Sequence, residues 1–206
     1  MRAIFSSALM AMTVLVLSSC TALAQDRPSS PRGETATQIG GAYDDGDYEG
    51  GSWVAIDYSR PILRGRTEMF GSGDSYGTSV SGNGPVWRAG ANKSTRLMTE
   101  TDLMFGDNTL PAGEYSLFIE LVSESEWMLI LSNHQAQAQS GEGEGIWGAY
   151  GYSADMDVFR TAMSVSEAPF TFDQLTFSFV NMTQEGGTLA LMWDNTLATV
   201  DFSVAR

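Results

Sequence analysis

The sequence contains very few of the residues that most often carry chemistry. Its 206 residues include one cysteine, Cys20, and one histidine, His134. Cys20 lies at the end of an apolar N-terminal segment, so the remainder of the chain has no disulfide, no thiolate metal site and no catalytic cysteine. A single histidine also excludes sites that need two or more imidazole ligands. We therefore predict neither a metal site nor a cofactor.

Positive charge is scarce as well. Eleven Lys and Arg residues stand against 25 Asp and Glu, for a formal net charge of −14, and Lys93 is the only lysine. A surface of this sign repels phosphate backbones, which argues against nucleic-acid binding. Beyond the N-terminal segment, no apolar stretch approaches the length of a membrane-spanning helix.

Residues 1–24 have the pattern of a secretory signal. Arg2 precedes an apolar run from Ala3 to Leu17, which is short and rich in small residues. Two processing sites remain open: a lipobox ending at Cys20, whose cysteine would be lipidated, and cleavage after Ala24. Either site predicts an extracytoplasmic protein, periplasmic or held at the envelope by a lipid on Cys20, and this anchor is the only membrane contact we expect.

The rest of the chain divides into two segments. Residues 25–50 are rich in Gly, Asp, Ser and Pro and predict a flexible acidic tether. Residues 51–206 show alternating apolar positions separated by Gly-rich turns, which predicts one all-β domain, an antiparallel β-sandwich of immunoglobulin-like, prealbumin-like or jelly-roll-like type. At most one short helix is expected, between Tyr152 and Ser164.

Several motifs resemble the DUF2911 family of secreted bacterial proteins. They are SPRGET at residues 30–35, IDYSRP at 56–61, RGR at 64–66, VWRAGAN at 86–92, LPAGEYSL at 110–117 and WGAY at 147–150. The resemblance extends from about residue 30 to residue 204 and implies a compact, β-rich exported domain without an established activity. Residues 70–86 are longer and richer in Gly and Ser than the family's usual link.

Basic residues concentrate in one region. Six of them fall within 37 positions: Arg60, Arg64, Arg66, Arg88, Lys93 and Arg96. Guanidinium groups offer a planar donor fork to a carboxylate, phosphate or sulfate, although pairing with internal Asp and Glu is an alternative. Trp and Tyr near Arg and Asn in two motifs are typical of sugar sites and also of cores.

These features predict non-catalytic binding of a small-molecule or carbohydrate-like (glycan) ligand. The expected binding residues are Tyr58, Arg60, Arg64, Trp87, Arg88, Asn92, Trp147 and Tyr150.

Two other functions remain open. The domain could instead be a structural or assembly partner of another envelope protein, recognised through an edge strand or its acidic face. A hydrolase would use His134 or the carboxylates Asp155 and Asp157, which share one face of an extended chain. No Gly-x-Ser-x-Gly elbow accompanies these residues.

Overall fold

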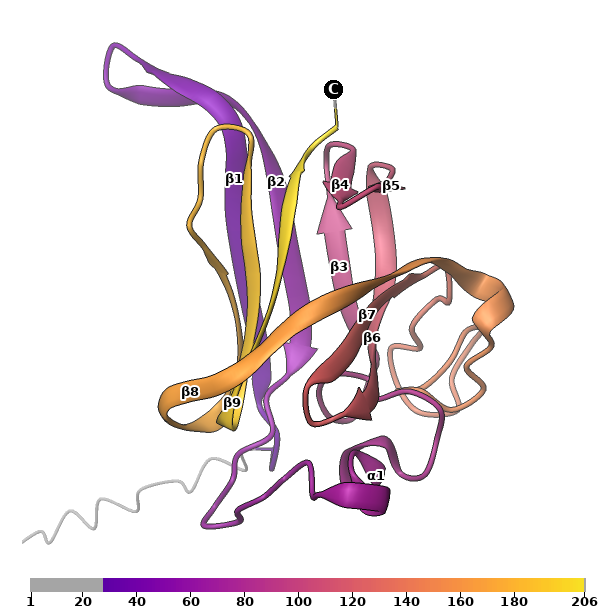
Figure 1. Cartoon of the computed structure of the whole chain (residues 1–206). Coiled ribbons are helices and arrows are strands. Elements are labelled where there is room, and N and C mark those ends of the chain that lie inside the picture. Colours follow the sequence, from indigo (N-terminus) through magenta and orange to yellow (C-terminus); the bar gives the residue numbers. More distant parts are fainter. Residues whose placement is uncertain (1–27, 206) are drawn as a thin grey trace, which may run out of the picture.

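The computed structural model describes residues 28–205, and Figure 1 shows their arrangement. The predicted leader, with Cys20 and Ala24, lies outside this range. Strands dominate the described residues, with one α-helix and two short 3-10 helices. The strands are β1 (Arg32–Asp44), β2 (Asp47–Ser59), β3 (Thr95–Thr99), β4 (Leu103–Phe105), β5 (Asn108–Leu110), β6 (Gly113–Ser123), β7 (Glu126–Ser132), β8 (Asp157–Val180) and β9 (Gly186–Val204); α1 is Thr78–Ser81, and the 3-10 helices are Gly73–Ser75 and Ala154–Met156.

All of these strands pair antiparallel in the order β1-β2-β3-β6-β7-β8-β9-β4-β5. Strand β8 connects two layers, because residues 157–163 pair with β7 and residues 164–180 pair with β9. Figure 1 shows β8, in orange, crossing from one layer to the other. The prediction of an all-β antiparallel fold with one short helix is confirmed.

The core lies between the two layers, where the alternating apolar side chains meet. Val54, Ile56 and Tyr58 of β2 are buried, as alternation predicts. The ring of Tyr58 contacts the ring of Phe177 on β8 edge to face, with centroids 5.0 Å apart. Burying each large apolar side chain contributes about 1.5–3 kcal/mol, so these cross-layer contacts hold the sheet folded over itself.

The predicted tether over residues 25–50 is wrong from Arg32 onward. Residues 32–44 form β1, paired along its length with β2. Asp45 and Gly46 connect the strands with φ angles of 46° and 96°, which is the geometry that two-residue hairpin turns favour. The hairpin is held by backbone hydrogen bonds, and these do not require the apolar alternation on which the sequence interpretation relied.

The α-helix also lies elsewhere than expected. Helix α1 falls inside the Gly-rich segment 71–85, between Gly77 and Gly82 in the left-handed conformation. Residues 152–164 instead hold a 3-10 helix followed by the start of β8. No helix in residues 28–205 is both long and apolar enough to cross a membrane.

Candidate functional site

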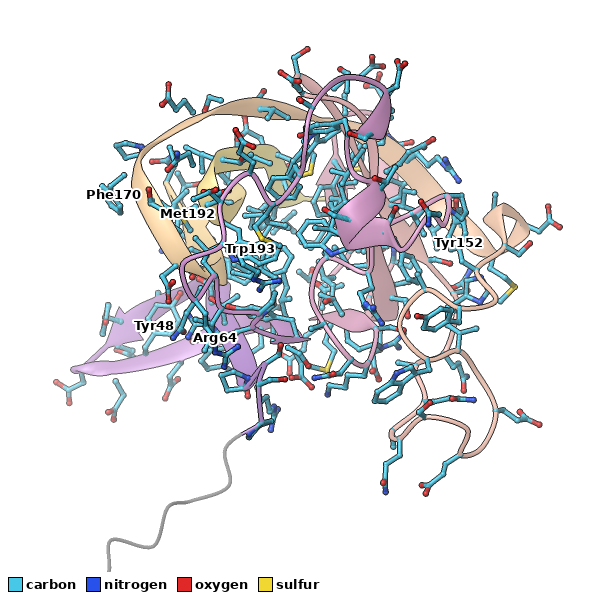
Figure 2. The ribbon with its side chains drawn as sticks, turned by 90° about the horizontal axis from the view of Figure 1, so that it is seen from below. Tyr48, Arg64, Tyr152, Phe170, Met192 and Trp193 are labelled. Carbon is cyan, nitrogen blue, oxygen red and sulfur yellow. The ribbon has the colours of Figure 1, made fainter. Side chains whose placement is uncertain are left out.

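Three of the eight predicted binding residues line one pocket of about 420 Å³. We call it the arginine pocket and define it by Arg64, Arg66, Met69, Trp87, Arg88 and Trp193. These side chains come from the loop after β2, the loop before β3 and strand β9. Figure 2 labels Arg64 and Trp193, which lie near each other in the view from below. No carboxylate side chain lines this pocket among the described residues.

The arginines of the pocket are held by backbone carbonyls. Arg64 donates to the carbonyl of Ser29 at 2.7 Å, and Arg88 donates to the carbonyl of Asn92 at 3.0 Å. Arg66 donates to two carbonyls in its own turn, at 3.0 and 2.8 Å. Within residues 28–205, none of the three lies within 4.0 Å of a carboxylate oxygen, so their charges are oriented but not neutralised.

Other basic residues show the opposite behaviour. Arg32, Lys93, Arg96 and Arg160 each form at least one ion pair with an acidic side chain. The alternative of internal pairing therefore applies to these four residues. It does not apply to the three arginines of the pocket.

Two tryptophans form the apolar wall of the arginine pocket. The rings of Trp87 and Trp193 stack with centroids 6.1 Å apart and an interplanar angle of 15°. Only 1% of Trp87 and 2% of Trp193 is exposed. The indole N–H of Trp193 is buried and has no acceptor among the described residues. An unpaired buried donor costs about 1–3 kcal/mol, so the wall retains a polar group that the fold itself does not use.

Three of the eight non-glycine residues with positive φ among the described residues lie in or beside the arginine pocket. Arg64, Ala89 and Asn92 have φ angles of 50°, 49° and 59°. Side chains other than glycine adopt this left-handed region at a cost of roughly 1–2 kcal/mol. Strain of this kind persists where surrounding structure enforces it, and it is common at ligand sites.

Tyr58 and Arg60 do not reach the arginine pocket. The hydroxyl of Tyr58 accepts a hydrogen bond from the backbone N–H of Phe177 at 3.1 Å, in the core. Arg60 donates to the carbonyl of Leu175 and the hydroxyl of Thr176. Both residues join the two layers, which is a structural role.

Asn92 and Tyr150 contact Arg88, whereas Trp147 forms neither a hydrogen bond nor a cation–π contact with it. Asn92 is exposed, and its carbonyl oxygen rather than its amide contacts Arg88. The guanidinium of Arg88 lies 5.8 Å from the centroid of the Tyr150 ring, which is 70% exposed. Trp147 is half-buried, and its carbonyl accepts from the N–H of Tyr150. Neither aromatic lines the arginine pocket; Tyr150 and Arg88 instead line a separate pocket of about 160 Å³.

The candidate hydrolytic residues lie near one another around Tyr152, whose ring centroid is 5.7 Å from that of His134 and whose hydroxyl donates to Asp157, but they do not form a catalytic arrangement. The Nε2 atom of His134 accepts from the N–H of Ser153 at 2.9 Å. Asp157 accepts from the hydroxyl of Tyr152 at 2.6 Å and from Arg160 at 3.0 Å. Asp155 is exposed on the 3-10 helix. One carboxylate is in an ion-paired network and the other faces solvent, so they do not form a carboxylate pair.

This network also shifts the pKa of the Tyr152 hydroxyl. Burial, followed by the hydrogen bond to Asp157 and the charge of that carboxylate, raises the pKa of Tyr152 far above its usual value. Tyr152 therefore stays protonated and acts as a donor that fastens the loop before β8 to the outer face of the sheet.

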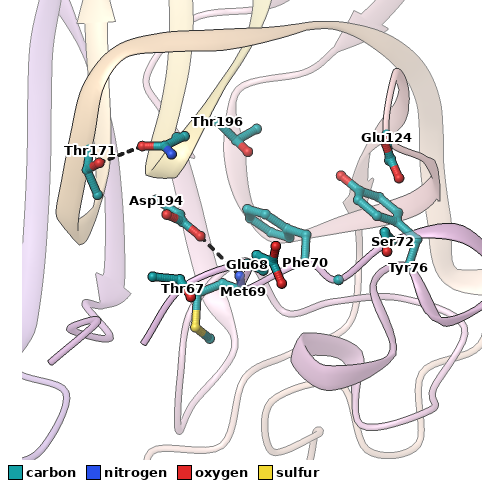
Figure 3. Close-up of a pocket in the computed structure, with 12 residues that line it drawn as sticks. Thr67, Glu68, Met69, Phe70, Ser72, Tyr76, Glu124, Thr171, Asp194 and Thr196 are labelled. Atoms are coloured by element: carbon teal, nitrogen blue, oxygen red, sulfur yellow. Dashed lines mark hydrogen bonds between the residues drawn. The ribbon is translucent and has the colours of Figure 1, made fainter. Parts of the chain in front are cut away.

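A second pocket, of about 390 Å³, adjoins the arginine pocket, and Met69 lines both. We call it the acidic pocket and define it by Glu68, Phe70, Tyr76, Glu124, Asp194 and Thr196. Figure 3 shows these side chains around one space, with the carboxylate of Asp194 accepting from the N–H of Met69 at 3.1 Å. Its three acids come from segments far apart in the chain, so no local motif could have indicated it.

The comparisons with known proteins identify the family. A family model described as a protein of unknown function (DUF2911) matches residues 45–202. The chain belongs to the DUF2911 family. The resemblance found in the motifs is confirmed, and the matched range includes the defining residues of both pockets. Searches among curated proteins and among solved structures gave no match.

Proposed function

We propose that this domain is an exported, non-catalytic binding module whose arginine pocket holds a small ligand with a carboxylate, phosphate or sulfate group, including acidic sugars. One observation carries the proposal. Three guanidinium groups line a single pocket without a carboxylate partner among the described residues, in a chain whose net charge is −14.

The energetics support a ligand at this place. A hydrogen bond to a charged group contributes about 1.5–3 kcal/mol, so losing one such bond raises the dissociation constant by roughly tenfold or more. The apolar wall of Trp87 and Trp193 limits water on one side of the guanidinium groups, which strengthens their attraction to an oxyanion. A third donor would tighten binding further.

Export is supported by the sequence of residues 1–24 and belongs to the same proposal. The two processing alternatives predict different products: a lipid-modified N-terminal cysteine at Cys20, or an unmodified N-terminus after Ala24. Mass spectrometry of the protein isolated from the producing cells distinguishes them. Globomycin, which blocks lipoprotein processing, would cause a precursor to accumulate only in the first case.

A role as an envelope assembly partner is a second candidate, and one feature favours it. Strand β1 lies at one end of the sheet order, and Tyr43 near the tip of its hairpin is 78% exposed. An unpaired strand edge offers main-chain hydrogen bonds to a partner. The hydrolase alternative has less support, because His134 and Asp157 already have structural partners.

The proposal is tested with the variants Arg64→Gln and Arg88→Gln. Isothermal titration with sulfate, ethyl phosphate and glucuronate measures binding to the purified protein. Each variant should weaken binding of the preferred anion by about tenfold or more, equivalent to about 1.4 kcal/mol. Thermal unfolding should change little for Arg64→Gln, whose side chain makes one exposed hydrogen bond.

Arg32→Gln is the matched control. It removes the same charge from an exposed side chain that already pairs with Asp57 and Glu34, so anion binding should remain as in the wild type. The proposal would be wrong if no anion bound, or if Arg32→Gln weakened binding as much as the pocket variants did, since the effect would then come from net charge alone.

A further inference from the structure

We infer that the arginine pocket and the acidic pocket bind one small zwitterion together, with its oxyanion among the arginines and its ammonium group among the carboxylates. The inference rests on the proposed function and adds the chemical class of the ligand. It comes from the contrast between two adjoining pockets, one lined by Arg64, Arg66 and Arg88 and the other by Glu68, Glu124 and Asp194.

The two sets of charges adjoin and yet do not neutralise each other. Among the described residues, neither the three arginines nor the three acids form an ion pair within 4.0 Å. Elsewhere in the described chain, acids such as Asp57 and Asp157 do pair with bases. The backbone holds the arginines and the carboxylates apart. A ligand that carries both a negative and a positive group can pair with both sets at once.

Asp194 provides the strongest evidence for a cationic group. Its residue is 7% exposed, and one carboxylate oxygen accepts from the N–H of Met69. Asp194 lines the acidic pocket, and no basic side chain among residues 28–205 lies within 4.0 Å of its carboxylate. A buried carboxylate without a counter-charge is costly, so an ammonium group placed beside it would be favoured.

The remaining walls of the acidic pocket suit an ammonium group as well. Phe70 and Tyr76 line it, and aromatic faces attract cations. The hydroxyl of Tyr76 accepts from the indole N–H of Trp127 at 2.8 Å, which fixes the orientation of its ring. Figure 3 shows Tyr76 and Glu124 on one side of the pocket and Asp194 on the other.

The spacing between the pockets indicates a short ligand. Arg66 and Glu68 are two residues apart, so their Cα atoms are separated by at most about 7 Å. Met69, which follows Glu68, lines both pockets. A few bonds between the oxyanion and the amine therefore span the two sites, as in a phosphorylated amino alcohol, whether free or as the headgroup of a lipid.

The test compares O-phosphoethanolamine with ethyl phosphate, which has the same skeleton without the amine. Titration calorimetry should show the wild-type protein binding O-phosphoethanolamine about tenfold more tightly, equivalent to about 1.4 kcal/mol. The triple variant Glu68→Gln, Glu124→Gln and Asp194→Asn, in which the new amide keeps an oxygen that can accept from Met69, should lose this advantage and keep its affinity for ethyl phosphate. Glu126→Gln, which removes an exposed acid at the start of β7 outside both pockets, should retain the advantage.

The possible results separate the two proposals. Equal wild-type affinity for both compounds would overturn the zwitterion and leave anion binding in place. An advantage that survives in the triple variant would also overturn it, because the three carboxylates would not be responsible. Failure to bind either compound would overturn the zwitterion together with the proposed function. Co-sedimentation with phosphatidylethanolamine vesicles, but not with phosphatidylglycerol vesicles, would support the lipid-borne form, whereas binding only in solution would support the free form.

Discussion

Tyr58 is one of the predicted binding residues, and the variant Tyr58→Phe measures how much its hydroxyl contributes to the stability of the fold. The variant removes a hydroxyl that accepts a hydrogen bond from the backbone N–H of Phe177 at 3.1 Å in the core. The edge-to-face contact of the two rings is kept, since only the oxygen is lost. The remaining cost is that of an unpaired buried N–H, about 1–3 kcal/mol. For a chain of this size, a loss of 2 kcal/mol lowers Tm by about 4–8 °C.

Differential scanning calorimetry and urea unfolding of wild type and variant check this value. Tyr150→Phe is the matched control, because that side chain is 70% exposed and should leave Tm unchanged. Anion binding to Tyr58→Phe should also be unchanged at a temperature well below its Tm, since Tyr58 does not line the arginine pocket. A Tm within about 1 °C of the wild type, equivalent to a few tenths of a kcal/mol, would show that the assumed hydrogen bond carries no net stability.

Three further outcomes are expected. Burial tends to raise the pKa of Asp57, but the hydrogen bonds and ion pairs of this carboxylate with Lys93 and Arg32 outweigh burial and lower the pKa. The ionised carboxylate therefore contributes its full stabilisation above the unfolded-state pKa, near 3.9, and this stabilisation is lost as the pH falls through the lower pKa of the folded state. Asp57→Asn should accordingly be less stable than wild type at pH 7, with the difference shrinking below about pH 3 in acid unfolding curves; a constant difference would contradict the assignment. Gln137→Ala should accelerate amide hydrogen exchange in residues 138–145, because that side chain bonds three backbone groups of the loop, while Tm stays the same; unchanged exchange would show that the loop is held by other contacts. Gly186→Ala should lose about 3 kcal/mol in urea unfolding, because a Cβ would overlap the backbone of Phe202 and Ser203 near the other end of β9; a smaller loss would mean that the backbone shifts to accommodate it.

The sequence predicted the strands whose side chains alternate and missed the hairpin that does not rely on alternation. Val54, Ile56 and Tyr58 are buried in the expected pattern. Strand β1 is mostly polar, with Ile39 as its only large buried side chain, and its pairing depends on a turn at Asp45 and Gly46. Local composition resembles that of a linker, because backbone hydrogen bonding leaves no trace in side-chain hydrophobicity.

The candidate site was predicted only in part for a related reason. Arg64, Trp87 and Arg88 stood out by their motifs and do line one pocket. Tyr58 stood out equally, yet it lies in the core, since a strand residue's role depends on which layer covers it. Trp193 and Asp194 carried no signal, because a tryptophan and an acid in an alternating strand are ordinary.

The sequence by itself determined the sign of the surface charge, the absence of thiol and multi-histidine chemistry after Cys20, the all-β class and the family. These properties follow from composition and short-range periodicity, which folding does not change. Only the tertiary structure decided which arginines remain without a carboxylate partner and that an acidic pocket adjoins them. Both facts depend on β8 passing between layers and bringing β9 against the loops that follow β2, and contacts between such distant segments are not encoded in any local pattern.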